Sequence, residues 1–484
     1  MKTMKPHYYT PLKIKTTKEG SRSLIETPPE VIGEGTYGCV HRPSLRCDKG
    51  KGTSKINYKG KISKLGTKKT INAEIAEYKT IDQVDKSAFF YPGTPNICRP
   101  MKDEPTLEAI DKCSDFESKK VDKYKLLIMN DGGENLEDFA KRVAASGDDI
   151  SARSQMEKFW IEAHRMFLGL SKFLEAGIVH HDLKHKNIVY NQKLNRINFI
   201  DFGLMTTIET IRNESRRSIY GFSIRHWSFP PEMAFINYDA YLKITEKDPA
   251  KPSKSEEKTT RQKEYAKYLN ELRDSNSHIN TIFMITVPDF KEKKQESFYV
   301  QEHTNEYYRM IMTSLLKNEY NEFLDKTIST IDSYGLATGL IYVLNKTRFL
   351  IDEQLANDLF NLFSNMMNFN VMERISINDA MSRYEDILQN NRILEKYNKH
   401  FENHELISEN NDIVQQSLSG IKIPDVNISD ARLESDPESK CPPSTTFNKK
   451  KKRCIRSKRK RTKTTASKTK RAKYSDKADY SMNL

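Results

Sequence analysis

The sequence predicts an α+β fold followed by a basic tail without stable structure. Three observations support this prediction: a glycine-rich hairpin near the N-terminus, a long amphipathic helix followed by short apolar strands, and a C-terminal segment dominated by positive charge. With 484 residues, of which 37% are hydrophobic and 30% charged, the chain can bury a sizeable core. About a quarter of it remains outside that core.

The first element is a hairpin with the spacing Gly-x-Gly-x-x-Gly-x-Val. Glycine permits backbone angles and close approaches that larger side chains forbid, so this turn can lie over a triphosphate and donate N–H groups to it. The motif alone is weak, because it also opens dinucleotide-binding sites. The sequence shows no ribose-binding acid in a βαβ unit downstream, which favours the triphosphate interpretation. The candidate ATP-binding residues are Ile32, Gly33, Glu34, Gly35, Thr36, Tyr37, Gly38 and Val40.

A helix and two short strands surround the most informative segment of the chain. Apolar residues recur at steps of three and four from Gln155 to Ala176, the pattern of a buried amphipathic helix, and Gly177 is a typical helix stop. Residues 188–190 and 197–200 are predicted strands. His-His-Asp-Leu-Lys-His-Lys-Asn at residues 180–187 precedes the first strand, and Asp-Phe-Gly at residues 201–203 follows the second.

These two segments resemble the catalytic loop and the magnesium loop of eukaryotic-type protein kinases. The resemblance implies a two-lobed protein kinase fold, with a small β-rich N-lobe and a larger helical C-lobe. It implies that Asp182 is the catalytic base and that Asn187 and Asp201 bind Mg²⁺, with Mn²⁺ as the alternative ion. Lys184 would contact the transferred phosphate, which is the serine/threonine kinase pattern. In the competing structural interpretation, these residues only end core strands.

The resemblance also requires a lysine on a strand, paired with a glutamate on the next helix. Lys64 is the best candidate for the lysine. The helix, roughly residues 70–84, offers Glu77 and Glu74. Glu77 is preferred, because two apolar residues follow it four and seven positions later on the same face, and Glu74 remains the alternative.

Residues 126–136 resemble the strand and hinge that join the lobes of a kinase. Met129 would guard the back of the adenine pocket. Asn130 and Asp131 would present main-chain groups to the adenine edge. This assignment depends on the position of the segment between the other motifs.

Three further matches concern architecture. Glu232 would end the activation segment, Arg374 would pair with it, and Asp332 would hold the catalytic loop from a buried helix. A buried ion pair supports the fold, since the loss of one partner leaves an uncompensated charge.

The resemblance divides the chain into five segments. Residues 1–28 are an N-terminal extension without the apolar centre of a signal peptide. The others are a kinase domain at 29–396 (N-lobe about 29–129, hinge 130–133, C-lobe 134–396), an insertion within it at about 238–325, a polar acidic linker at 397–440 and a basic disordered tail at 441–484.

His181 stands where many kinases have an arginine that answers a phosphate on the activation segment. A histidine does this weakly at neutral pH. We therefore expect activity to depend little on phosphorylation of that segment.

The positive charge belongs to the tail. Residues 449–473 hold 15 Lys or Arg and no acidic residue, so subtracting 15 from the formal charge of +14 leaves about −1 for the rest. This segment is a candidate contact for nucleic acid or an acidic partner, or a nuclear address, and the structural alternative is a solvated tail. Aromatic residues are nearly absent there, which argues against base stacking.

Composition also bears on location. The chain has six cysteines and no Cys-x-x-Cys pair, which predicts a reducing, intracellular compartment without disulfides or structural zinc. No apolar run approaches the roughly 20 residues that a membrane span needs.

Residues 37–43 with Cys47, residues 62–65, and Cys441-Pro442-Pro443 resemble serine/threonine kinases of giant nucleocytoplasmic DNA viruses. This similarity implies a viral protein of the host cytoplasm, virus factory or virion, with the nucleus as the alternative through the tail.

The prediction is a protein serine/threonine kinase that transfers the ATP γ-phosphate to Ser/Thr hydroxyls of protein substrates. The alternatives are a catalytically weak pseudokinase acting as a scaffold, and a nucleic-acid-associated protein acting through its basic tail. The sequence does not indicate an oligomeric state.

Overall fold

The computed structural model describes residues 27–35, 38–48, 56–217, 228–245, 314–408, 445–448 and 453–456. Thr36 and Tyr37 of the glycine hairpin lie outside the described residues, as do most of the expected insertion and nearly all of the tail. The chain divides into two compact units, Met1–Asn411 and Asp412–Leu484.

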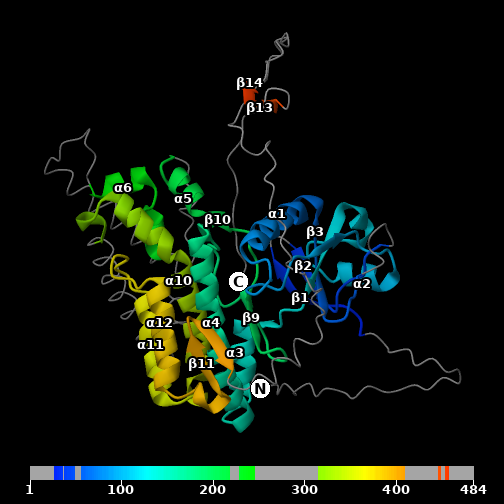
Figure 1. The fold of residues 1–484 in the computed structure, drawn as a ribbon. Helices are drawn as coiled ribbons and strands as arrows, with labels where there is room; N and C mark the ends of the chain where they lie inside the picture. Colours follow the sequence, from blue (N-terminus) through cyan, green and yellow to red (C-terminus); the bar gives the residue numbers. More distant parts are fainter. Residues whose placement is uncertain are drawn as a thin grey trace. The chain divides into compact units, whose positions relative to one another are not determined.

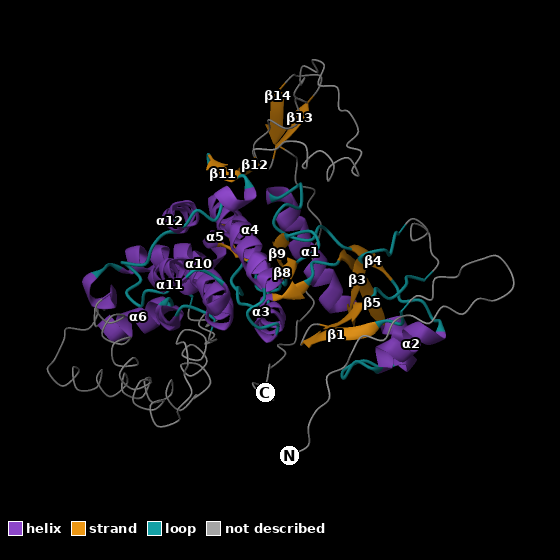
Figure 2. Cartoon of the chain, turned by 90° about the horizontal axis from the view of Figure 1, so that it is seen from below, coloured by secondary structure: helices purple, strands orange, loops and turns teal. Residues whose placement is uncertain are grey.

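The first unit begins with an antiparallel sheet, in which the strands follow the order β1-β2-β3-β5-β4 (Figures 1 and 2). The strands are β1 Glu30–Gly35, β2 Gly38–Arg42, β3 Lys61–Thr67, β4 Asn96–Cys98 and β5 Tyr124–Asn130. β1 and β2 form the predicted glycine hairpin. β2 pairs with β3 so that Val40 lies opposite Lys64, which confirms that the lysine is on a strand beside the hairpin.

Three helical segments accompany this sheet: α1 Lys68–Val84, α2 Glu104–Asp111 and the short 3-10 helix η2 Ser118–Lys123. α1 begins where it does because the Thr67 hydroxyl accepts a hydrogen bond from the backbone N–H of Thr70 at 3.2 Å. Its buried face consists of Ile71, Glu74, Tyr78 and Ile81, spaced at three and four residues. One acidic residue therefore lies on the inner face of this helix.

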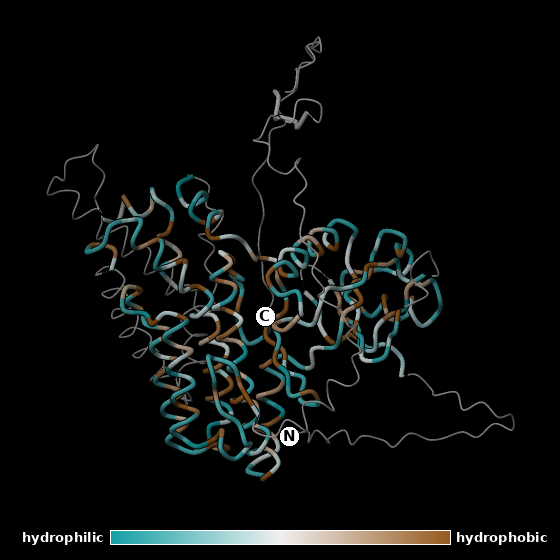
Figure 3. Tube along the Cα trace, viewed as in Figure 1, coloured by the Kyte–Doolittle hydropathy of each residue, from teal (hydrophilic) through white to brown (hydrophobic). Residues whose placement is uncertain are grey.

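The remainder of the first unit is mainly helical. Its longer helices are α3 Leu136–Ala145, α4 Ile150–Glu175, α5 Ile208–Ser215, α6 Tyr238–Thr245, α10 Tyr320–Thr347, α11 Glu353–Met366 and α12 Ile377–Asn390. Short 3-10 helices are η3 Pro231–Phe235, η4 Arg348–Leu350 and η5 Glu395–Tyr397. Apolar and polar stretches alternate along these helices, as expected where one face of each is buried (Figure 3).

α4 confirms the predicted amphipathic helix and starts earlier than expected. The Asp149 carboxylate accepts from the Ser151 N–H, which caps its first turn. The predicted stripe is buried, except that Leu174 is half-buried. The chain leaves the helix through Gly177, whose φ of 71° suits the residue after a helix end.

Short strands follow α4 and position the loops predicted to be catalytic. β8 Ile188–Asn191 and β9 Arg196–Phe199 pair as expected, with β6 Glu134–Asn135 on the other side of β8. β7 Ile178–Val179 pairs with β10 Thr206–Thr207. The loops at residues 180–187 and 200–205 thus begin and end at paired backbone.

Three predicted boundaries need correction. α10 starts at Tyr320, inside the range expected for the insertion. β11 Lys399–Glu402 and β12 Glu405–Ser408 form a hairpin where the polar linker was expected, and Phe401 and Leu406 pack against the core. In the second unit, β13 Thr445–Asn448 pairs with β14 Arg453–Arg456, so the prediction of a tail without structure is wrong for these strands.

The expectation that the cysteines remain unpaired is also wrong. Disulfides join Cys39 to Cys113 and Cys47 to Cys98. These pairs are 74 and 51 residues apart in the sequence, so local spacing could not indicate them. Among the described residues, no helix is long and apolar enough to span a membrane.

Candidate active site

The Asp182 carboxylate is held by two other predicted site residues. Lys184 Nζ lies 2.9 and 3.0 Å from its two oxygens. Asn187 Nδ2 donates to Asp182 Oδ2 and to the Asp182 carbonyl, at 2.8 Å each. Asp182 and Asn187 are buried, with 9% and 5% of their surface exposed. Because the amide nitrogen of Asn187 faces Asp182, its oxygen is left for another ligand.

The catalytic loop is fixed from behind by α10, as predicted. Asp332 accepts hydrogen bonds from the backbone N–H groups of His180 at 2.6 Å and His181 at 2.8 Å. Burial raises the pKa of Asp332, and the neighbouring His180 opposes this rise. His181 has a φ of 67°, a left-handed conformation that costs a non-glycine residue free energy. The buried aspartate offsets that cost by binding both flanking amides.

Backbone contacts join the catalytic loop to the loop that carries Asp201. The Ile200 N–H donates to the Asn187 carbonyl at 3.0 Å, and the Ile200 carbonyl lies 3.1 Å from His180 Nε2. Asp201 itself has a φ of 60°. The structure therefore brings Asp201 next to Asn187, in a second strained conformation.

An aromatic contact connects the Asp201 loop to α1. The Phe202 ring packs edge-on against Tyr78, with 5.7 Å between ring centroids. The negative charge of Asp201 contributes to raising the pKa values of Glu74 and Glu77, after burial as the main cause. Asp201 thus lies within electrostatic reach of the helix that carries the predicted partner of Lys64.

Lys64 pairs with Glu74, and the preference for Glu77 was wrong. Lys64 Nζ lies 2.8 Å from Glu74 Oε2, and the two side chains are 14% and 11% exposed. Burial raises the pKa of Glu74, while Lys64 opposes the rise. The buried stripe of α1 contains Glu74 because it is three residues from Ile71 and four from Tyr78.

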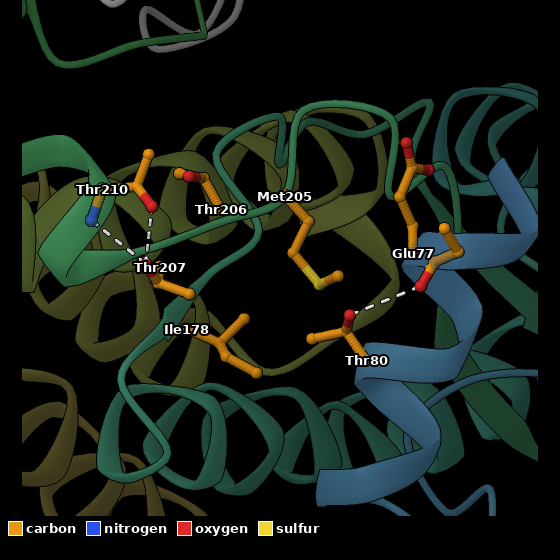
Figure 4. Close-up of a pocket in the computed structure, with 8 residues that line it drawn as sticks. Glu77, Thr80, Ile178, Met205, Thr206, Thr207 and Thr210 are labelled. Carbon is orange, nitrogen blue, oxygen red and sulfur yellow. Dashed lines mark hydrogen bonds between the residues drawn. The ribbon is translucent and has the colours of Figure 1, made fainter. Parts of the chain in front are cut away.

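Glu77 instead lines a separate cavity of about 280 Å³. Figure 4 shows it between α1 and the segment around β7 and β10. Burial, followed by the charges of Glu74 and Asp201, raises the pKa of Glu77 to about 7. The other lining residues are Ala76, Thr80, Ile178, Met205, Thr206, Thr207 and Thr210.

The glycine hairpin lies against the strand that carries Lys64. A Cβ added to Gly38 would meet the Leu65 carbonyl oxygen at 2.4 Å, so only glycine allows this approach. At Gly33 and Gly35 an added Cβ would meet nothing within 4 Å, which leaves open space above the turn. Of the remaining hairpin predictions, Ile32 is 44% exposed and Val40 is half-buried.

Glu34 points away from the expected phosphate role. Its carboxylate accepts hydrogen bonds from the N–H and the hydroxyl of Ser114, at 2.8 Å each. This contact ties the glycine hairpin to the segment after α2.

Two of the hinge predictions fit the structure and one does not. Met129 is half-buried and receives a hydrogen bond from the Tyr78 hydroxyl to its sulfur at 3.6 Å. Asn130 ends β5 opposite Lys61. The Asp131 N–H donates to the Gly60 carbonyl at 2.9 Å, so it is not free to meet an adenine ring. The Asp131 carboxylate binds Arg42 at 2.6 Å, which gives this residue a structural role.

The predicted architectural pair is present and fully buried. Arg374 Nη1 and Nη2 lie 2.5 and 3.1 Å from the two oxygens of Glu232, and both side chains are 0% exposed. Arg374 also donates to the Asn368 carbonyl at 2.9 and 3.0 Å. This second set of bonds helps satisfy a guanidinium that has no water around it.

One functional contact could not be predicted from the motif. The His181 ring stacks on Phe229, with centroids 4.9 Å apart and 23° between the ring planes. Burial, followed by the charge of His180, lowers the pKa of His181 to about 4, so the ring is neutral at physiological pH.

Comparison with known proteins supports a kinase-like family for this region. A family model described as the ABC1 atypical kinase-like domain matches residues 140–227. The match includes Asp182, Lys184, Asn187 and Asp201 and covers less than a fifth of the chain. No curated protein matched the chain. The matched region is therefore kinase-like, in keeping with a β-rich N-terminal part followed by a helical remainder.

Proposed function

We propose that the protein is a serine/threonine kinase that transfers the γ-phosphate of ATP to hydroxyl groups of protein substrates. The observation that carries this proposal is the bonding of Asp182 to both Lys184 and Asn187, next to the loop of Asp201. The ion pair of Lys64 with Glu74 adds a cation beside the glycine hairpin.

The residues present suit a magnesium nucleotide. Asn187 and Asp201 offer hard oxygen ligands, which Mg²⁺ prefers. When bound, the ion would neutralise charge on the phosphates. The open space above Gly33 and Gly35 suits the backbone approach that a triphosphate needs. Lys64, oriented by Glu74, would bind phosphate oxygens.

The reaction then assigns a task to each catalytic-loop side chain. Asp182 would accept the proton of the attacking hydroxyl, because its carboxylate is held in one orientation by Asn187. Lys184 neutralises that carboxylate in the structure and would turn to the incoming phosphate. This lysine, two residues after the base, is our reason for proposing serine and threonine as acceptors.

The test compares the protein with the variant Asp182→Asn on a generic basic protein substrate. We expect the variant to lose at least about 100-fold in kcat, because general-base catalysis typically contributes that much. It should bind ATP as the parent does, since Asp182 is not assigned to nucleotide binding. Equal phosphate transfer by both proteins would exclude the proposal and favour a scaffold with a kinase-like fold.

The charge of the tail supports a second, separable activity. We propose that residues 449–473, with 15 basic side chains, bind nucleic acid through its phosphates. A chain ending at Lys440 should lose this binding and keep kinase activity. Retained binding by the shortened chain would exclude the tail as the contact.

A further inference from the structure

A buried cluster of metal-ligating side chains lies beside the glycine hairpin. Cys39 and His41 come from β2, and Cys113 comes from the turn after α2. One ligand atom from each lies within 4.8 Å of the other two. The three residues are 1%, 0% and 3% exposed. The described residues contain no second group of this kind.

The spacing of these atoms resembles a tetrahedral zinc centre with the two sulfurs drawn together. Around Zn²⁺, bond lengths of about 2.3 Å to sulfur and about 2.0 Å to nitrogen place sulfur and nitrogen ligands about 3.5 Å apart. His41 Nε2 lies 3.9 Å from Cys39 Sγ and 3.4 Å from Cys113 Sγ. Only the two sulfurs, joined here in a disulfide, would have to separate, to about 3.8 Å. Their Cα atoms are 6.2 Å apart.

A fourth ligand is close by. Glu34 Oε1 lies 3.7 Å from Cys39 Sγ, and Ser114 holds the same carboxylate next to Cys113. Two sulfurs, one imidazole nitrogen and one carboxylate oxygen form a ligand set that zinc accepts. Burial, the largest cause, lowers the pKa of His41, so its ring is neutral as a metal ligand must be.

We propose that Glu34, Cys39, His41 and Cys113 form a zinc site that exchanges with the Cys39–Cys113 disulfide according to the redox state. A dithiol reductant passes two electrons and two protons to the disulfide and becomes a cyclic disulfide itself. Zn²⁺ then replaces the two thiol protons. In the reverse direction, a peroxide oxidises the two thiolates to the disulfide, is reduced to water and releases Zn²⁺.

In the disulfide form, His41 Nε2 lies 3.1 Å from the Ala109 carbonyl and donates to it. Zinc binding requires the other tautomer, with the proton on Nδ1 and the Nε2 lone pair directed at the metal. Both forms connect the glycine hairpin to the turn after α2. The proposal does not depend on kinase activity, because it concerns metal binding alone.

The test uses the full chain, reduced, stripped of metal and titrated with Co²⁺ as a spectroscopic probe for zinc. We expect tetrahedral cobalt bands with thiolate-to-metal charge transfer. Zn²⁺ should slow alkylation of Cys39 and Cys113 at least 10-fold, measured by mass spectrometry, and leave Cys47 and Cys98 within twofold. Peroxide should then release the metal as the Cys39–Cys113 bond forms.

The second disulfide provides a matched control. The pair of substitutions Cys47→Ser and Cys98→Ser should retain the cobalt bands, whereas Cys39→Ser with Cys113→Ser should abolish them. His41→Ala should weaken Co²⁺ binding at least 10-fold. A reduced chain without thiolate–cobalt bands would overturn the proposal, and so would protection that maps to other cysteines. The alkylation experiment uses the unaltered protein, so its outcome does not depend on folding of the variants.

Discussion

The catalytic loop and the glycine hairpin differ in what holds them in place. The loop is fixed by buried groups of the helical part: Asp332 binds two of its amides and Asn187 binds its base. The hairpin is fixed by strand pairing with β3 and by side-chain contacts to the turn after α2. Substitutions in the helical part should therefore cost stability, whereas those around the hairpin should mainly change activity or ligand binding.

The largest effect should come from the buried pair that supports the helical part. Arg374→Met leaves Glu232 charged and without its partner, so we expect the free energy of unfolding to fall by about 3–5 kcal/mol. Urea unfolding followed by tryptophan fluorescence measures this, since Trp160 is fully buried in the same part. The double variant Glu232→Gln with Arg374→Met should lose less. If the double variant loses more than Arg374→Met, the free charge is not the cause.

The next effect concerns the choice between the two glutamates of α1. Glu74→Gln should lower kcat/KM by about 100-fold, the scale of losing one oriented charge at a phosphoryl-transfer site. Glu77→Gln, the matched control three residues away, should change kcat/KM by less than about threefold. Equal losses in the two variants would contradict the assignment of Glu74 as the partner of Lys64.

The sequence was sufficient for the catalytic loop because the relevant residues are local. Asp182, Lys184 and Asn187 lie within six positions, and their mutual hydrogen bonds follow from one turn of the chain. The helix before them and the strands after them were predictable from apolar spacing. Asp332 and Arg374 also took their expected places, because a buried polar group needs one specific partner.

Around the hairpin the sequence was less informative. Both glutamates are on α1, and the choice depends on how the helix is rotated against β3. The stripe of Ile71, Tyr78 and Ile81 could have indicated Glu74, because it contains only residues on the inner face. The disulfide of Cys39 with Cys113 depends on where α2 packs, which no local pattern contains. The Cys-x-His at residues 39–41 was visible but has no Cys-x-x-Cys spacing.

A smaller effect should appear in the pH dependence of stability. The pKa of Glu77 rises from 4.5 to about 7 on folding, so the folded protein binds more protons than the unfolded chain between these values. The contribution of Glu77 is therefore present at low pH and is lost as pH rises through about 7. At pH 8 Glu77→Gln should be more stable than the parent by about 1 kcal/mol, after allowance for solvent screening at this half-buried site.

At pH 4.5 the two proteins should have the same free energy of unfolding within error, because Glu77 is then protonated. Urea unfolding at both pH values gives the comparison. A constant difference across the pH range would mean that the amide acts through packing and not through proton binding.

The smallest effect should follow removal of phosphate from the activation segment. His181 stacks on Phe229 and has a pKa of about 4, so at neutral pH it carries no charge with which to hold a phosphate. Asp332 already fixes the loop through backbone amides, without any modification. Phosphatase treatment should accordingly change kcat/KM by less than about twofold, with mass spectrometry to confirm that Thr206, Thr207, Thr210 and Ser215 are unmodified. A loss of 10-fold or more would show that another cation, and not this histidine, senses the segment.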